Sequence, residues 1–269
     1  MTKTALAKKL GISRSTLYYQ KKQPLKDLKR YFEIKAVMDK NPAYGHERVG
    51  DALGISKNTA KRIMKKFGLK PKLMRRKPRY QAKKTKTNHP NLIKGICPIR
   101  PNIIWVTDFT WIKYKQKFIY LATVLDVFTK QIVGHHVLKN HCTDLVKLAL
   151  YDAIERSKAI PEVLHSDQGS EYESIEFENL LKALEIDISR SAVASPWQNG
   201  YQEAFFSHFK LELGNPNRFQ HAGELIEAIH KQIDYYNQDR IHSRLKTSPN
   251  QFFINYQQSL KGLKIKANC

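Results

Sequence analysis

The pattern of hydrophobic and polar positions changes character near residue 100. Beyond Pro101, the runs 103–114 and 117–128 are rich in Ile, Val, Thr and aromatic residues, as strands are, and a short polar turn separates them. A third run of this kind, 131–138, follows after another short turn. The three runs predict three neighbouring antiparallel strands.

Helical and strand-like patterns alternate after this point. Apolar residues recur at helical spacing from Thr143, over 174–184, after Asn199 and from 222 to about 236, whereas 162–165 and 187–191 are short strand-like runs. This order predicts an α/β domain with a mixed five-stranded sheet. We expect the domain to occupy residues 101–218 and a helical C-terminal extension to follow over 219–269.

The segment 195–210, SPWQNGYQEAFFSHFK, raises a question of its own. Its helical part would direct Phe205, Phe206 and Phe209 toward a core, yet Glu203 lies just before them. Burial of a carboxylate without a partner is costly. Glu203 therefore faces either water or a cation.

The first 70 residues contain a short internal repeat, because LGISRST at 10–16 is echoed by LGISKNT at 53–59. In both copies a helical pattern meets a Gly that can end a helix, and a Ser follows where the next helix needs a cap. Helix, glycine turn and capped helix is the helix-turn-helix layout, whose second helix enters the DNA major groove. We therefore predict small all-α helix-turn-helix units over 1–24 and 25–70. The candidate DNA contacts on their second helices are Arg14, Ser15, Lys57, Asn58, Lys61 and Arg62.

Positive charge is concentrated in the same part of the chain. Residues 1–100 contain 28 Lys and Arg against 5 Asp and Glu, an excess of 23 that equals the formal net charge of the whole chain. Such a segment attracts a polyanion and releases its counterions, which is the usual source of nucleic-acid affinity. Residues 71–100 lack a sustained period and contain four prolines. They are predicted to form a basic linker, with Arg75 and Arg76 as candidate phosphate contacts.

Composition excludes several classes of protein. No apolar run approaches the length of a membrane span, and the first residues show no apolar signal sequence. The three cysteines, Cys97, Cys142 and Cys269, lie far apart and form no CxxC pair, so a disulfide framework or a zinc site is not expected. These features predict a cytoplasmic protein without membrane association.

Three acidic residues occupy comparable places in the predicted α/β domain. Asp108 lies within the first strand, where an unpaired acid is costly, and Asp167 follows the fourth strand, at the kind of strand end where functional groups gather. Together with Glu203 they would offer only oxygen ligands, which suit hard cations such as Mg²⁺ or Mn²⁺. Spacing alone leaves three unrelated surface acids as the alternative. The tryptophans of the first strand, Trp105 and Trp111, are expected to be core residues, with base-stacking platforms as the less favoured alternative.

The surroundings of these acids resemble the DDE transposases and retroviral-type integrases. The matching stretches are WVTDFT at 105–110, HSDQG at 165–169 and SPWQNGYQEAFF at 195–206. More narrowly, the whole chain is similar to the product of the second reading frame of bacterial insertion sequences of the insertion-sequence-three family.

This resemblance implies an RNase H-like catalytic fold. Asp108, Asp167 and Glu203 would be the catalytic, metal-binding residues and would hold two Mg²⁺ ions, for which Mn²⁺ would substitute, around the attacking and leaving oxygens. The implied activity is strand cleavage that frees a 3′-OH at the element end, followed by transfer of that 3′-OH to target DNA. Lys210 matches the basic residue that the family places after its Glu, and it would contact phosphate. Arg240 and Arg244 are further candidate DNA contacts.

The resemblance also implies partners. They are double-stranded DNA, as the terminal inverted repeats of the element and as target, and further copies of the chain, because joining two ends needs at least two protomers. No apolar heptad pattern is visible, and the family places a helix-turn-helix and leucine-zipper protein in an upstream frame. We expect that protein as a partner or frameshift fusion, and a location in the bacterial cytoplasm on the nucleoid. A catalytically spent DNA-binding regulator and an RNase H-type nuclease are the alternative functions.

Overall fold

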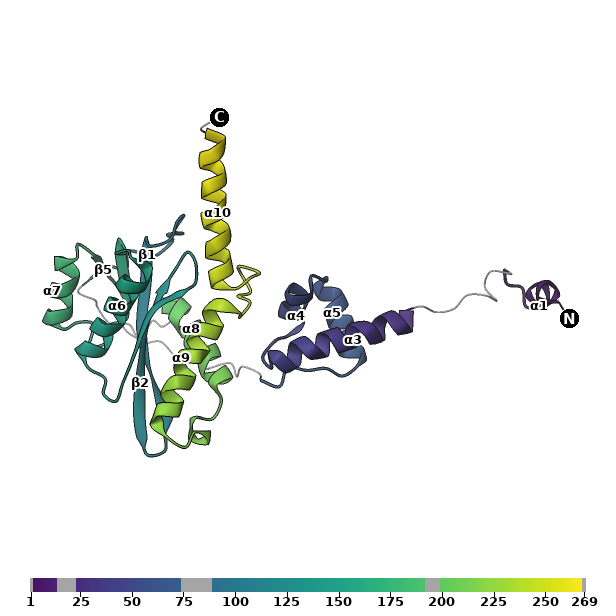
Figure 1. Ribbon diagram of the computed structural model, residues 1–269, viewed down its shortest axis with the longest axis horizontal. Coiled ribbons are helices and arrows are strands. Elements are labelled where there is room, and N and C mark those ends of the chain that lie inside the picture. Colours follow the sequence, from purple (N-terminus) through teal and green to yellow (C-terminus); the bar gives the residue numbers. More distant parts are fainter. Residues whose placement is uncertain (1, 14–22, 74–88, 192–198, 268–269) are drawn as a thin grey trace. The chain divides into compact units, whose positions relative to one another are not determined.

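The computed structural model describes residues 2–13, 23–73, 89–191 and 199–267 (Figure 1). Internal contacts divide the chain into two compact units, residues 1–72 and 73–269. Within the described ranges, no helix combines the length and the apolarity needed to cross a bilayer.

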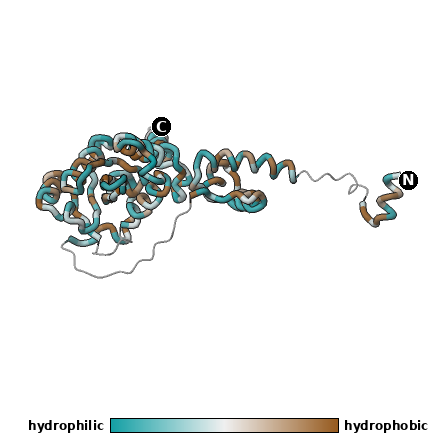
Figure 2. The backbone as a smooth tube through the Cα atoms, turned by 90° about the horizontal axis from the view of Figure 1, so that it is seen from below, coloured by the Kyte–Doolittle hydropathy of each residue, from teal (hydrophilic) through white to brown (hydrophobic). Residues whose placement is uncertain are grey.

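The first unit is helical. It contains α1 (Lys3–Lys9), α3 (Gln23–Lys40), α4 (His46–Leu53) and α5 (Lys57–Lys66). Ile34, Val49 and Ile63, one from each of α3, α4 and α5, are fully buried and form its core. Hydrophobic and hydrophilic residues alternate along these helices in Figure 2, as expected of helices with one buried face.

The junction between α4 and α5 has the geometry that the sequence predicts. Gly54 ends α4 at φ 62°, and the Ser56 hydroxyl accepts a hydrogen bond from the Thr59 amide at 3.2 Å to cap α5. Gly50 allows the two helices to approach, because a Cβ at this position would lie 3.0 Å from the Ile55 carbonyl oxygen. The predicted second helix of the first repeat, 14–20, lies outside the described residues.

The second unit is built on a mixed five-stranded sheet of order β3-β2-β1-β4-β5. Its strands are β1 (Ile104–Tyr114), β2 (Lys117–Asp126), β3 (Ile132–Leu138), β4 (Val163–Ser166) and β5 (Asp187–Arg190). The first three are antiparallel neighbours, and β4 and β5 continue the sheet in parallel with β1. The sheet therefore confirms the predicted mixed α/β architecture.

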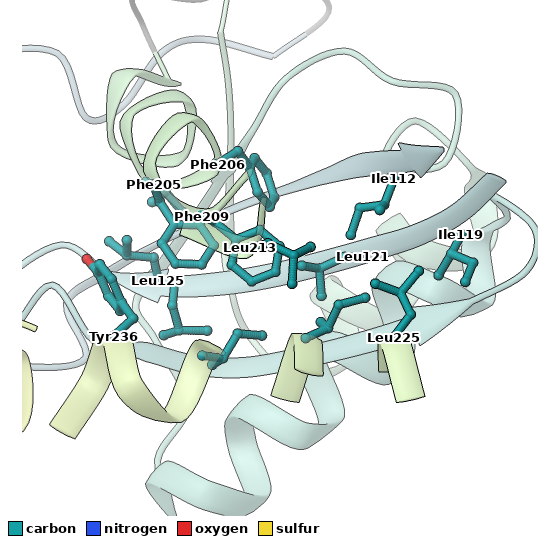
Figure 3. Packing of buried hydrophobic residues seen from close by; sticks show 14 of the residues in the cluster. Ile112, Ile119, Leu121, Leu125, Phe205, Phe206, Phe209, Leu213, Leu225 and Tyr236 are labelled. Carbon is teal, nitrogen blue, oxygen red and sulfur yellow. The ribbon is translucent and has the colours of Figure 1, made fainter. Parts of the chain in front are cut away.

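Helices cover both faces of this sheet. One face packs on α6 (Thr143–Ser157) and α7 (Ile175–Ala183), and the other on α8 (Gly200–Leu213) and α9 (Ala222–Gln238). Figure 3 shows Phe205, Phe206 and Phe209 of α8 against the strands, which confirms the predicted inward face of this helix. A short 3₁₀ turn (Pro216–Arg218) and α10 (Pro249–Ala267) complete the unit.

Two elements differ from the predicted pattern. The 18-residue helix α3 has no counterpart among the predicted helices. The strand β2 ends two residues early, because the Asp126 carboxylate accepts hydrogen bonds from the Thr129 amide at 2.6 Å and from its hydroxyl at 2.9 Å. This side-chain capping turns the chain before the apolar run is complete.

Candidate active site

Strand register brings the first two carboxylates to the same level of the sheet. In the parallel pair β1–β4, Val106 lies opposite His165. Because parallel strands advance together, two further residues on each strand place Asp108 level with Asp167. Among the described strands, none pairs with β1 on this side beyond Val106, so the edge of β1 is open at Asp108.

The third carboxylate is positioned through its neighbour, Gln202. This side chain is fully buried, and its Nε2 donates to the Val106 carbonyl at 2.6 Å and to the Thr123 carbonyl at 3.1 Å. Its Oε1 accepts from the Thr123 hydroxyl at 2.8 Å. These bonds fix the first turn of α8 on β1 and β2, which places Glu203 beside the strand that carries Asp108.

Electrostatics shows that the acids share one environment. The pKa of Asp108 is raised to about 8, mainly by burial and then by the charge of Asp167, with a smaller contribution from Glu203. A hydrogen bond from the Phe109 amide at 2.7 Å and the charge of Lys210 oppose this rise. Negative charge at this place is therefore only partly compensated by the protein.

Asp167 experiences similar forces. Burial raises its pKa, and a hydrogen bond from the Gly169 amide at 3.0 Å acts in the opposite direction. Space at Gly169 is tight, since a Cβ there would lie 3.2 Å from Asp167 Oδ1 and 3.3 Å from Glu171 Oε2. The loop that carries Asp167 is thus shaped around its carboxylate.

A buried arginine supports the same loop. Arg190 is 1% exposed, and its guanidinium donates to the Ser166 hydroxyl at 2.9 Å and to the Tyr172 carbonyl at 2.6 Å. Its positive charge also lowers the pKa of Asp167. Arg190 therefore fixes the end of β4 on both sides of Asp167.

The donor set of this site fits a hard divalent cation. Asp108, Asp167 and Glu203 offer carboxylate oxygens alone, without a softer ligand among them. Among the described residues, no three acidic, His or Cys side chains already lie close enough to hold one ion. Asp108 and Asp167 each direct one carboxylate oxygen to a backbone amide. The other carboxylate oxygen of each remains available as a ligand.

Lys210 lies two helical turns after Glu203 and is exposed. Its ammonium is 4.8 Å from the centre of the Trp111 ring. Burial lowers the pKa of this ammonium, and the charge of Asp108 acts in the opposite direction. Trp105 is fully buried as predicted, but Trp111 is 56% exposed, so its predicted core position is wrong. The reason is that Trp111 lies on the part of β1 where no β4 residue pairs.

The other predicted DNA contacts fall into several groups. Lys57, Asn58 and Lys61 are exposed on α5, and Arg244 is exposed in the loop after α9. Arg14, Ser15, Arg75 and Arg76 lie outside the described residues.

Two of the predicted arginine contacts have internal partners. Arg62 donates to both carboxylate oxygens of Asp27 on α3, at 2.9 and 2.7 Å, and it holds α5 to that helix. Arg240 is 2% exposed, and its Nε donates to Glu212 at 2.8 Å. The prediction of a DNA contact is wrong for Arg240, because an ion pair buries its side chain within the unit.

Sequence reasoning missed Gln202 and Arg190. A signal existed for Gln202, since it precedes Phe205 and Phe206 by three and four residues and so shares their inward face. A polar residue on an apolar helix face needs buried partners, which the strand carbonyls supply. No comparable signal exists for Arg190, whose partners come from a distant loop.

Comparisons with known proteins identify the family of this chain. Residues 98–196 match the integrase core domain, and residues 184–249 match a second family of the same description. The transposase for insertion sequence element IS904 from Lactococcus lactis is 34% identical over 231 residues, which cover 82% of this chain and 91% of that protein.

Two solved structures are also similar. The simian T-cell lymphotropic virus intasome, solved with the PP2A regulatory subunit B56 gamma, aligns at a TM-score of 0.51 and 19% identity over 82% of this chain and 73% of that one. The HTLV-2 integrase catalytic core, solved in complex with magnesium, aligns at a TM-score of 0.48 and 22% identity over 57% of this chain and 97% of that one. The alignment with the intasome chain shows that the fold is that of the RNase H-like integrase core. The chain belongs to the insertion-sequence transposases that carry an integrase core domain.

Proposed function

We propose that this protein is a DDE transposase that cleaves DNA strands at the ends of its insertion sequence and transfers the 3′-OH ends to target DNA. The observation that supports the proposal is that the charges of Asp167 and Glu203 act on the buried Asp108 at the open edge of β1. The raised pKa of Asp108 marks a place where added positive charge would be stabilising.

The three carboxylates would hold two Mg²⁺ ions, with Mn²⁺ as a substitute. When bound, such ions supply charge neutralisation at the attacking and leaving oxygens. The side chains of the protein fix the geometry: Gln202 holds Glu203 beside β1, and Arg190 holds the Asp167 loop. Lys210, exposed next to Asp108, would bind a phosphate oxygen adjacent to the scissile bond.

Two displacements at phosphorus would then follow at one site. In the first, water attacks the phosphodiester at the element end and the 3′-OH leaves. In the second, that 3′-OH attacks a phosphodiester of target DNA, a new strand joint forms, and the 3′-oxygen of the target strand leaves as a 3′-OH. Bonds balance in each step, because one P–O bond forms as another breaks, and no covalent intermediate with the protein is needed.

Recognition of duplex DNA is assigned to the first unit. The exposed face of α5 presents Lys57, Asn58 and Lys61, and Ser56 caps this helix. A capped, basic second helix of a helix-turn-helix is suited to the major groove. This feature favours duplex DNA ends as substrate over RNA–DNA hybrids, which are recognised by shape in a shallow minor groove.

Assembly on DNA is part of the same proposal. Pairing two element ends needs at least two protomers, and we infer a homo-oligomer on DNA that also involves the upstream-frame zipper protein, as partner or fusion. A gel shift with one and two end fragments, with and without that protein, measures this. Pairing of two ends by this chain without that protein would contradict its involvement.

The catalytic proposal is tested with Glu203→Gln. The probe is duplex DNA carrying the inverted repeats that flank the gene, incubated with Mg²⁺ or Mn²⁺. We expect cleavage and joining to fall by roughly 10³-fold, the scale seen when a group that stabilises transition-state charge is removed. The matched control is Glu155→Gln, an exposed glutamate of α6, which should cleave normally.

Three results would contradict the proposal. Near-normal joining by Glu203→Gln would exclude the metal-site assignment. Absence of metal-dependent cleavage by the unmodified protein would indicate a DNA-binding regulator. Faster cleavage of RNA–DNA hybrids than of duplex ends would indicate an RNase H-type nuclease.

A further inference from the structure

Trp111 is a large aromatic side chain in a place where packing does not explain it. It is 56% exposed, and Phe118 beside it on β2 is 44% exposed. The two ring centres are 5.5 Å apart and the planes meet at 85°, so Phe118 supports the indole edge-on. A supported aromatic ring that faces solvent is a feature of binding surfaces.

Trp111 also lies close to the carboxylates. It follows Asp108 by three residues on β1, about 10 Å along the strand, and the two side chains leave opposite faces of the sheet near its open edge. The exposed Lys210 connects the two places, because its ammonium is 4.8 Å from the Trp111 ring and responds to the charge of Asp108. The ring is therefore within reach of a nucleotide whose phosphate lies at the acids.

The charges around Trp111 select the kind of partner. Lys113 lies opposite Phe118 in the β1–β2 pair and is exposed, and Lys210 adds a second cation. Interfaces between proteins are depleted of Lys at their centres, whereas nucleic-acid surfaces combine cations with aromatic rings. The Trp111 patch, defined as Trp111, Phe118, Lys113 and Lys210, thus fits a polyanion with flat bases better than a second copy of this chain.

We propose that Trp111 stacks on an unpaired base of the DNA strand whose phosphodiester lies at Asp108, Asp167 and Glu203. This inference rests on the proposed function, which it deepens by requiring separated strands at the reacting end. The base must be unpaired because both faces of a paired base are covered by its neighbours in the duplex. Lys210 has a flexible chain, so its ammonium can leave the indole for a phosphate when DNA binds.

The test uses the full chain and a short duplex of generic sequence with a single-stranded arm that carries the fluorescent base 2-aminopurine. Ca²⁺ replaces Mg²⁺ so that binding is measured without cleavage. We expect the unmodified protein to quench the fluorescence of the arm. Trp111→Ala should lose this quenching and bind the forked DNA roughly tenfold more weakly, the effect of losing one base–aromatic stack. Its affinity for a fully paired duplex should not change.

Two variants serve as controls. Trp111→Phe keeps an aromatic face and should retain most of the quenching and affinity. Tyr151→Ala removes an aromatic side chain that is 44% exposed on α6, and it should behave like the unmodified protein. Circular dichroism confirms that each variant is folded.

The outcomes separate this inference from the proposed function. Equal weakening of forked and paired DNA by Trp111→Ala, or no weakening, would overturn the stacking site even if the protein cleaves DNA with metal. If Trp111→Ala changes the oligomeric state but still binds forked DNA more tightly than paired DNA, the stacking site is wrong. The patch would then bind a second copy of this chain. Retained fork preference in a protein that shows no cleavage would leave the stacking site valid and refute only the catalytic proposal.

Discussion

The charged carboxylate of Asp108 destabilises the folded protein relative to a neutral side chain at the same position. Its neighbours on β1, Val106 and Ile112, are buried apolar residues of the core. The carboxylate between them has its pKa raised to about 8 by burial and by the nearby acids. A residue that opposes folding in this way is expected at a functional position.

The sign of this pKa shift predicts the pH dependence of stability. A raised pKa means that the folded state binds the proton more tightly than the unfolded chain, whose Asp titrates near 4. The associated stability is therefore present below about pH 4 and is lost as the pH rises to about 8. Asp108→Asn, which stays neutral, should be more stable than the metal-free parent at pH 8.5 by a few kcal/mol. Thermal unfolding from pH 5 to 8.5 in a chelator measures the difference.

The same thermal unfolding measurements are repeated with Mg²⁺ in place of the chelator. Mg²⁺ should raise the melting temperature of the parent more at pH 8.5 than at pH 6, because a deprotonated carboxylate binds it. Asp108→Asn should respond weakly at both. If Mg²⁺ raises the melting temperature of the parent equally at both pH values, the assignment of Asp108 as a ligand is wrong.

Gln202 provides the second prediction for a single residue. Gln202→Met keeps the size of the side chain but removes the partners of the Thr123 hydroxyl and the Val106 carbonyl. Two buried groups without partners should lower the free energy of unfolding by about 2 to 4 kcal/mol. Strand cleavage well below the melting temperature should also fall, since Glu203 loses its anchor, while duplex affinity is retained. Gln238→Met, at an exposed position of α9, is the control and should change neither the free energy of unfolding nor the rate of strand cleavage.

The individual residues also show how far sequence reasoning reaches. Asp108, Asp167 and Glu203 could be predicted because each stands in a distinctive local stretch, and a charged residue in an apolar strand is visible without a structure. Arg240 and Trp111 could not be assigned correctly. Arg240 is buried by its ion pair with Glu212, and Trp111 is exposed where β4 no longer pairs with β1. In both cases the determining partner lies far away in the sequence.

Among the secondary-structure elements, periodicity predicted the sheet well. The strands of the second unit were predicted to within two residues at their ends, because each is a run of β-branched and aromatic residues bounded by turns. The helix α3 escaped prediction because its buried residues are few, with Ile34 and Met38 alone among its apolar side chains fully packed. Its remaining apolar residues, such as Leu25 and Phe32, are exposed and blur the period.

The packing of β3 on α6 gives a prediction for an element pair. A Cβ at Gly134 would lie 2.4 Å from the Ala153 amide nitrogen and 2.5 Å from the Ala149 carbonyl oxygen. These are backbone atoms of α6, so the helix as a whole would have to move. Gly134→Ala should therefore lower the free energy of unfolding by about 3 kcal/mol or more, measured by denaturant or thermal unfolding.

Gly223→Ala is the matched control. A Cβ at Gly223, in the first turn of α9, meets no atom within 4 Å. This substitution should stabilise the unit by up to about 1 kcal/mol, because alanine loses less backbone entropy in a helix. Equal effects of the two substitutions would show that the β3–α6 contact can relax.

At the scale of the whole molecule, charge and chemistry belong to different units. Residues 1–72 contain 19 Lys and Arg against 5 Asp and Glu, residues 73–100 contain 9 against none, and residues 101–269 contain 19 of each. The three candidate acids all lie in the last, electrically balanced range. We therefore expect the first unit to supply much of the salt-dependent DNA affinity and the second to supply the reaction.

This division of work predicts a change in salt dependence. Each phosphate contact contributes about 0.9 to the slope of log affinity against log salt. Lys57→Ala combined with Lys61→Ala should therefore reduce the slope by about 1.8 if both contact phosphate through α5. Lys26→Ala combined with Lys29→Ala, at two exposed positions of α3, removes the same charge from another helix and should leave the slope nearly unchanged. Fluorescence anisotropy with labelled duplex across a salt series measures both. Equal reductions for the two pairs would mean that the unit attracts DNA through its total charge and that α5 has no special place in recognition.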